Sequence, residues 1–178
     1  MNNKMTFDIG KLENALSVKI STNKTVLGLD TASRSGYCIA KTTGKTLTIS
    51  TGFIAVDVSK IKDKVVRNAL RYNAVYETLT QLVTKDQILV IEDVFFARNV
   101  YTAILLARIG AIAYCVGRQK EIRDIRWKTA IQARKMLGLP CNKKKELVHK
   151  EFTEKVGTKI TDIDIIDAII LALCGLIE

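Results

Sequence analysis

Three apolar runs of this chain are interrupted by carboxylates, and this pattern limits the possible folds more than any other feature. The runs cover residues 26–30, 88–92 and 163–170, and they contain Asp30, Glu92 and the pair Asp164 and Asp167. Residues in such runs become part of a hydrophobic core, where an unpaired carboxylate is costly. The fold must therefore bring these side chains to a cation, and Mg²⁺, which prefers oxygen ligands, is the first candidate.

Length and charge agree with a single domain that binds a polyanion. The chain has 178 residues, of which 48% are hydrophobic, and this is enough for one domain with a proper core. It carries 28 lysines and arginines against 18 acidic residues, for a formal net charge of +10. A basic surface around an acidic pocket suits a polyanion that is held by its backbone and cut at a metal site. A soluble basic protein with no such partner would explain the charge equally well.

The cysteines indicate reduced thiols rather than a zinc site or a disulfide framework. They are widely spaced, form no C-x-x-C pair and are accompanied by a single histidine: Cys38, Cys115, Cys141 and Cys174. No N-terminal signal segment is recognisable, and the longest apolar tract, residues 163–177, is broken by two aspartates. We therefore expect a cytoplasmic protein, or one of the host cytoplasm if it is viral, without a membrane partner.

The order of strand and helix patterns predicts an α/β domain over residues 24–178. Residues 25–30, 37–41 and 46–56 are typical of an antiparallel meander, and a helix at 60–84 leads to a strand at 88–92 that should pair in parallel. A helix at 102–116, a strand at 122–125 and helices at 127–137, 144–156 and 162–176 follow. Residues 1–23 are expected to form an N-terminal extension, with a short amphipathic helix from Ile9 to Ile20. Thr161 could cap the last helix while Asp164 completes a capping box, which is the alternative to a metal-binding role for Asp164.

This order matches the ribonuclease-H-like fold, and three motifs resemble those of the RuvC family of Holliday junction resolvases. Residues 28–37 resemble the first motif, in which a strand aspartate, here Asp30, precedes a Ser-Arg turn and a Gly-Tyr strand, although Thr-Ala replaces the usual Pro-Gly. Glu92, with an aromatic residue three positions later, resembles the second motif, and residues 164–168 resemble the C-terminal Asp-x-x-Asp-Ala motif. The resemblance extends from Val26 to Leu176 and implies a mixed five-stranded sheet with helices on both faces.

The expected chemistry explains why four carboxylates are needed. Residues three apart on a helix lie on one face, so Asp164 and Asp167 can both point toward Asp30 and Glu92. Two Mg²⁺ ions, replaceable by Mn²⁺, could share Asp30 at a separation of roughly 3.5 to 4 Å. One would orient the attacking hydroxide and the other would stabilise the leaving 3′ oxygen. Without metal, repulsion between the carboxylates should raise some of their pKa values.

The resemblance also implies a homodimer, because a four-way junction is cut symmetrically on two strands. The helix expected at 102–116 contains small residues that would let a second helix approach closely: Ala103, Ala107, Gly110, Ala111 and Ala113. Packing of this helix on its own sheet is the alternative.

Contacts to branched DNA are expected from one aromatic and several basic residues: Arg34, Phe95, Lys128, Lys143, Lys144 and Lys145. By resemblance, Phe95 stacks on a base near the crossover while Phe96 belongs to the core. The lysines would contact backbone phosphates, with Lys144 or Lys145 near the scissile phosphate, although a solvated helix face is the ordinary explanation for such a run. Two further residues receive structural roles: Trp127 is expected in packing, and His149 on an exposed helix face.

These features predict a metal-dependent, structure-selective endonuclease that resolves Holliday junctions by paired symmetric nicks. A ribonuclease H that cuts RNA in RNA–DNA hybrids would use the same four carboxylates without needing a dimer. The second alternative is a non-catalytic module that binds branched DNA, but binding alone gains nothing from buried acids.

Overall fold

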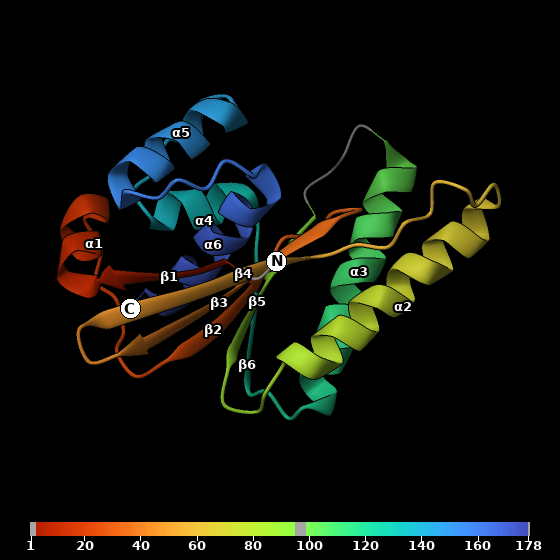
Figure 1. Cartoon of the computed structure of the whole chain (residues 1–178), viewed down its shortest axis with the longest axis horizontal. Coiled ribbons are helices and arrows are strands. Elements are labelled where there is room, and N and C mark those ends of the chain that lie inside the picture. Colours follow the sequence, from red (N-terminus) through yellow and green to blue (C-terminus); the bar gives the residue numbers. More distant parts are fainter. Residues whose placement is uncertain (1–2, 95–98, 178) are drawn as a thin grey trace.

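A mixed six-stranded sheet runs through the computed structural model, which describes residues 3–94 and 99–177 (Figure 1). Its strands follow the order β1-β4-β3-β2-β5-β6. The neighbours from β1 to β2 are antiparallel, whereas β5 pairs in parallel with both β2 and β6. The strand bounds are Asn3–Asp8, Thr25–Leu29, Ser35–Thr43, Thr46–Ile54, Ile88–Glu92 and Asp124–Lys128 for β1 to β6. The expected α/β fold is confirmed, with six strands rather than the five expected.

The sixth strand comes from the N-terminal segment, in which the sequence indicated only a helix. β1 pairs along its whole length with residues 46–51 of the meander strand β4, and Met5 and Phe7, two apart on one face, pack against the core. The helix α1 (Ile9–Leu16) follows directly and is shorter than expected, because Ser17 adopts a left-handed conformation with φ of 55° and ends it. The division of the chain into an N-terminal extension, residues 1–23, and a nuclease domain, residues 24–178, stays a prediction.

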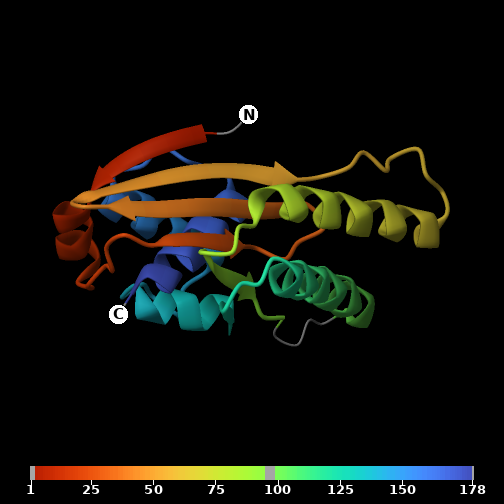
Figure 2. The ribbon, with the colours of Figure 1, turned by 90° about the horizontal axis from the view of Figure 1, so that it is seen from below.

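Helices cover both faces of the sheet, as expected (Figures 1 and 2). The helices α2 (Lys64–Leu82) and α3 (Val100–Gln119) pack together on one face. The other face is covered by α6 (Ile163–Leu176), behind which lie α1, α4 (Ala130–Met136) and α5 (Lys145–Val156). Trp127 begins no helix but lies in β6, where its ring stacks on Tyr114 of α3 with the ring centroids 6.3 Å apart. The packing role expected of Trp127 is therefore confirmed, although its element was wrong.

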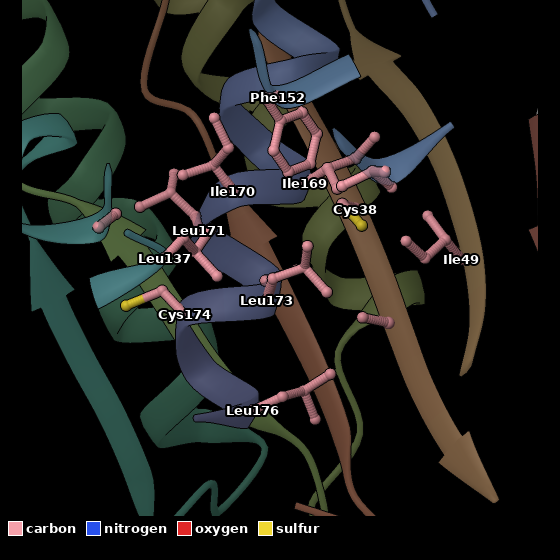
Figure 3. Close-up of a cluster of buried hydrophobic side chains, with 14 of the residues drawn as sticks. Cys38, Ile49, Leu137, Phe152, Ile169, Ile170, Leu171, Leu173, Cys174 and Leu176 are labelled. Atoms are coloured by element: carbon pink, nitrogen blue, oxygen red, sulfur yellow. The ribbon is translucent and has the colours of Figure 1, made fainter. Parts of the chain in front are cut away.

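The helix α6 is buried on almost every side, and this decides where its carboxylates lie. Its apolar side chains pack between the sheet and the outer helices, where Ile169 and Ile170 lie near Phe152 of α5 (Figure 3). The backbone of α6 also approaches β2 closely at Gly28, because a Cβ there would lie 2.5 Å from the carbonyl oxygen of Ala168. Glycine at this position therefore lets the helix rest directly on the strand that leads to Asp30.

Candidate active site

Asp30 and Glu92 lie side by side where two parallel strands end. The register of β2 on β5 runs from Val26 opposite Ile88 to Leu29 opposite Ile91, so the next residues on each strand, Asp30 and Glu92, are neighbours. Because side chains alternate along a strand, the side chains of Asp30 and Glu92 lie on the face of the sheet against which α6 packs. Their carboxyl groups are close enough for a hydrogen bond between them to contribute to the raised pKa of Asp30.

The backbone holds these two strand ends in place. The Asp30 amide donates to the carbonyl of Gly36 at 3.0 Å, which closes the turn into β3. The Thr31 hydroxyl donates to the carbonyl of Glu92 at 3.5 Å, a weak contact that links one strand end to the other. The two carboxylates are therefore positioned by regular strands and short backbone contacts rather than by long loops.

The charge of Asp30 is poorly compensated by the protein around it. Burial raises its pKa most, and the hydrogen bond to Glu92 and the charges of Glu92 and Asp167 raise it further, to about 10. The ammonium group of Lys145 opposes this effect only in part. The expectation that repulsion raises pKa values in a metal-free cluster is therefore confirmed, with burial as the larger cause.

Asp167 comes from the first turns of α6 and is ionised by basic neighbours. Its carboxylate is buried and contacts Arg134 of α4 as well as Lys145 and His149 of α5. Burial would raise the pKa of Asp167, but the hydrogen bond from His149 and the charge of Lys145 outweigh it and hold the pKa below its usual range. Asp30 and Asp167 thus share one site but are shifted in opposite directions.

His149 is the main functional candidate that the sequence interpretation missed. It was expected to be exposed and without a partner, but only 4% of its surface is accessible, and its Nε2 lies 2.8 Å from Oδ1 of Asp167. The expectation was wrong because distance along the sequence says little about contacts between helices. A usable signal was present, since 149 lies beside the apolar positions Val148 and Phe152, which mark the buried face of α5.

The structure treats Asp164 differently from the other three acids. Asp162, not Thr161, is the N-cap of α6, and its side chain accepts hydrogen bonds from the amides of Asp164 and Ile165. The capping box expected from Thr161 and Asp164 is therefore wrong, and Asp164 does not serve as a cap through its carboxylate. That side chain is half-buried one turn before Asp167, and within the described parts of the chain no contact joins it to Asp30 or Glu92.

The donor set of the site fits a hard divalent cation. Asp30, Glu92 and Asp167 supply only carboxylate oxygens, the ligands that Mg²⁺ and Mn²⁺ prefer, and the raised pKa of Asp30 marks uncompensated negative charge. Among residues 3–94 and 99–177, no three acidic, histidine or cysteine side chains are grouped closely enough to hold a metal ion as they stand. The ammonium of Lys145, on Asp167, offsets part of the negative charge of the acids, so a bound cation would have to displace it.

The residues expected to contact DNA surround this site unevenly. Lys145 reaches Asp167, and Lys128 pairs in register with Glu92 at the end of β6. Lys144 is exposed at the start of α5, and Lys143 pairs with Glu151 at 3.1 Å. Arg34 lies over the ring of Phe53 and pairs with the helix cap Asp162 at 2.6 Å. The predictions for Phe95 and Phe96 lie outside the described residues.

Comparisons with known proteins agree with this arrangement. Two solved structures of RuvC from Thermus thermophilus share the fold. One, in complex with a Holliday junction substrate, has a TM-score of 0.66 and 13% identity and covers 85% of this chain and 91% of that one. The other has a TM-score of 0.62 and 16% identity and covers 86% of this chain and 98% of that one. A comparison with curated protein sequences found no match.

The family assignment comes from a separate comparison. The family model described as crossover junction endodeoxyribonuclease RuvC matches residues 26–175, which include all four acids of the expected site. The chain therefore belongs to the RuvC family of crossover junction endodeoxyribonucleases, which depend on divalent metal ions.

Proposed function

We propose that this protein resolves four-way DNA junctions by paired symmetric nicks, as a homodimer and with Mg²⁺ as the usual cofactor. The observation that carries the proposal is the convergence of Asp30, Glu92 and Asp167 at one end of the parallel strands, in a chain of the RuvC family. The Thermus thermophilus protein of similar fold has been solved with a Holliday junction substrate.

The carboxylates define the catalytic residues of this proposal. Asp30, Glu92 and Asp167 would hold the metal, and Asp164, half-buried one turn before Asp167, would complete the set. A divalent cation there supplies charge that activates a water nucleophile and stabilises the leaving 3′ oxygen. The protein itself fixes the backbone of the acids on two strands and a buried helix, so the changes that metal binding requires are confined to side chains, above all Lys145.

The homodimer is supported by an apolar seam on α3. Val100, Ile104, Ala107, Ala111 and Tyr114 follow a 4-3-4-3 spacing and are all exposed. By length and composition α3 is apolar enough to cross a membrane. Only 28% of its most apolar stretch is buried within the chain, so much of its apolar surface is uncovered. Gly110 and Ala113 instead face the domain itself. Some small residues of α3 thus pack on the chain's own sheet, while others are free for a dimer contact. A second copy of α3 would cover the exposed seam.

The DNA would be held by its backbone at the same end of the molecule. Lys128, Lys143 and Lys144 are proposed phosphate contacts, and Lys145 would approach the scissile phosphate once it leaves Asp167. Arg34 and Phe95 remain proposed contacts near the crossover. Such contacts give affinity without much sequence preference, as a structure-selective enzyme requires.

The decisive experiment is cleavage of a labelled synthetic four-way junction beside a flap, a linear duplex and an RNA–DNA hybrid. Each substrate is tested with Mg²⁺, with Mn²⁺ and with EDTA, and Asp30→Asn is the matched control. We expect paired symmetric nicks in the junction that require the metal and disappear in the variant. Cleavage of the hybrid alone would reassign the protein as a ribonuclease H, and tight junction binding without cutting would leave a binding module.

A further inference from the structure

Three basic side chains contact Asp167, two at one carboxylate oxygen and one at the other. Oδ1 lies 2.8 Å from Nε2 of His149 and 3.3 Å from Nη2 of Arg134, and both side chains are buried. Oδ2 lies 2.5 Å from Nζ of Lys145, whose side chain is 42% exposed. One oxygen therefore has fixed, buried partners, whereas the other has a single long partner that reaches in from solvent.

His149 has no evident reason to be buried except its contact with Asp167. It lies on the face of α5 that otherwise buries Val148, Phe152 and Val156, where an apolar side chain would be cheaper. Because the carboxylate is ionised, Nε2 must donate the hydrogen bond. The other ring nitrogen, Nδ1, has no hydrogen-bond partner among the described residues. The whole polar function of this buried ring is thus directed at Oδ1.

Lys145 occupies the place of a cation in the carboxylate cluster. It lies one turn before His149 on α5, and its charge interacts favourably with Asp167, Asp30 and Glu92. A lysine head is a compact charge on a flexible four-carbon stem, so it can leave the cluster without disturbing the fold. His149 and Arg134 lack this freedom because the surrounding helices enclose them.

We propose that His149 and Arg134 are positioning residues that fix Oδ1 of Asp167, and that Lys145 is a placeholder that occupies Oδ2 until a divalent cation takes it. This inference rests on the proposed metal-dependent function. Partners that orient a metal ligand typically change metal affinity by about 10- to 100-fold when they are removed. A placeholder has the opposite effect, since its positive charge competes with the metal.

The test is direct titration of Mn²⁺ into the purified full-length protein without DNA, followed by electron paramagnetic resonance. His149→Met removes the donor but keeps an unbranched side chain, and we expect it to weaken Mn²⁺ binding by about 10- to 100-fold. His149→Gln keeps an N–H donor close to the position of Nε2 and should restore binding. His149→Asn places its donor near Nδ1 instead and should bind as weakly as the methionine variant.

Lys145→Met tests the second half of the proposal in the same titration. We expect tighter Mn²⁺ binding than in the wild type, together with slower junction cleavage because a phosphate contact is lost. Lys155→Met is the matched control, since Lys155 lies on the same helix but pairs with Glu151 on its outer side. This control should leave the Mn²⁺ affinity unchanged.

The outcomes separate this inference from the proposed function. Mn²⁺ binding by His149→Met or His149→Asn that equals the wild type would overturn the positioning role, even if the melting temperature falls. Weaker binding by Lys145→Met would overturn the placeholder role. If the wild-type protein itself binds no Mn²⁺ in this titration, the proposed metal site is wrong.

Discussion

Asp30 and Asp167 show at the scale of single residues how one site can hold both a protonated and an ionised carboxyl group. Asp30 shares a hydrogen bond with another acid, whereas Asp167 is surrounded by His149, Lys145 and Arg134. Opposite pKa shifts within one cluster are characteristic of functional sites. They also make the stability of the metal-free protein depend on pH.

We expect the metal-free protein to lose stability as the pH rises from about 5 to 9. An unfolded aspartate releases its proton near its usual pKa of about 4, whereas folded Asp30 keeps its proton up to a pKa of about 10. Between these values the folded state binds one more proton, so the free energy of unfolding falls, by at most about 1.4 kcal/mol per pH unit. Urea unfolding in EDTA at several pH values measures this slope. Asp30→Asn should flatten it, and equal slopes for both proteins would contradict the prediction.

The acids and the basic residues of the site differ in how far the sequence predicts them. Asp30, Glu92 and Asp167 each interrupt an apolar run. Burying a carboxylate costs free energy, so acids at such positions are expected to have a function. The apolar neighbours of His149 on α5 indicate that it is buried, but they do not name its partner. Only the packing of α4 and α5 against α6 brings Arg134 and His149 to Asp167.

At the scale of secondary-structure elements, the close contact between α6 and β2 aligns the site. The contact is possible because Gly28 has no side chain: an added Cβ would also lie 2.5 Å from the amide nitrogen of Ala172. Both neighbouring atoms belong to the helix backbone, so a side-chain rotation cannot relieve the clash. The distance between Asp30 and Asp167 is therefore set by a glycine outside the site.

We expect Gly28→Ala to lower the free energy of unfolding by about 1–3 kcal/mol through overpacking. Cleavage should fall as well, because α6 must move away from β2 and take Asp167 with it. Gly10→Ala is a suitable control, since the nearest atom to its added Cβ is a carboxylate oxygen of Asp8 at 3.3 Å. Thermal unfolding and junction cleavage measure the two effects, and a Gly28→Ala protein as stable as the control would show that α6 tolerates the displacement.

The exposed seam of α3 yields a second prediction at this scale. Ala107→Glu would place a charge at the centre of the proposed helix–helix contact, where two copies would repel each other. We expect a folded monomer with an unchanged circular dichroism spectrum and a loss of symmetric cleavage. Lys120→Glu, at the C-cap of α3 and away from the seam, is the control that should remain dimeric. Sedimentation velocity measures the oligomeric state, and a dimeric Ala107→Glu variant would exclude this surface as the interface.

At the scale of the whole molecule, the proposed DNA contacts gather at the end of the sheet where the carboxylates lie. Lys128 pairs with Glu92 at this end. Lys41 pairs with Thr25 at the start of β2, and Lys45 lies in the following hairpin, so both are at the opposite end. Basic residues that contribute to the net charge of +10 therefore lie at both ends of the sheet, but only one end holds the site.

This separation permits a matched test of the DNA surface. In an Asp30→Asn background, replacing Lys128, Lys143 and Lys144 by Gln should weaken junction binding, and the slope of log affinity against log salt should fall by up to about 0.9 per lost phosphate contact. Replacing Lys41 and Lys45 by Gln removes charge at the far end and should change the slope little. Fluorescence anisotropy over a range of NaCl concentrations measures both slopes, and equal losses would mean that the charge acts without a defined surface.

The sequence alone determined the fold class, the order of most elements and the acids of the site, because apolar periodicity and carboxylates in apolar runs are local signals. It also indicated the family through three motifs, each of which is a short continuous stretch of the chain. The tertiary structure decided the rest: the edge strand formed by Asn3–Asp8 and the contact of His149 with Asp167. These features depend on partners far away in the sequence, so no local pattern specifies them.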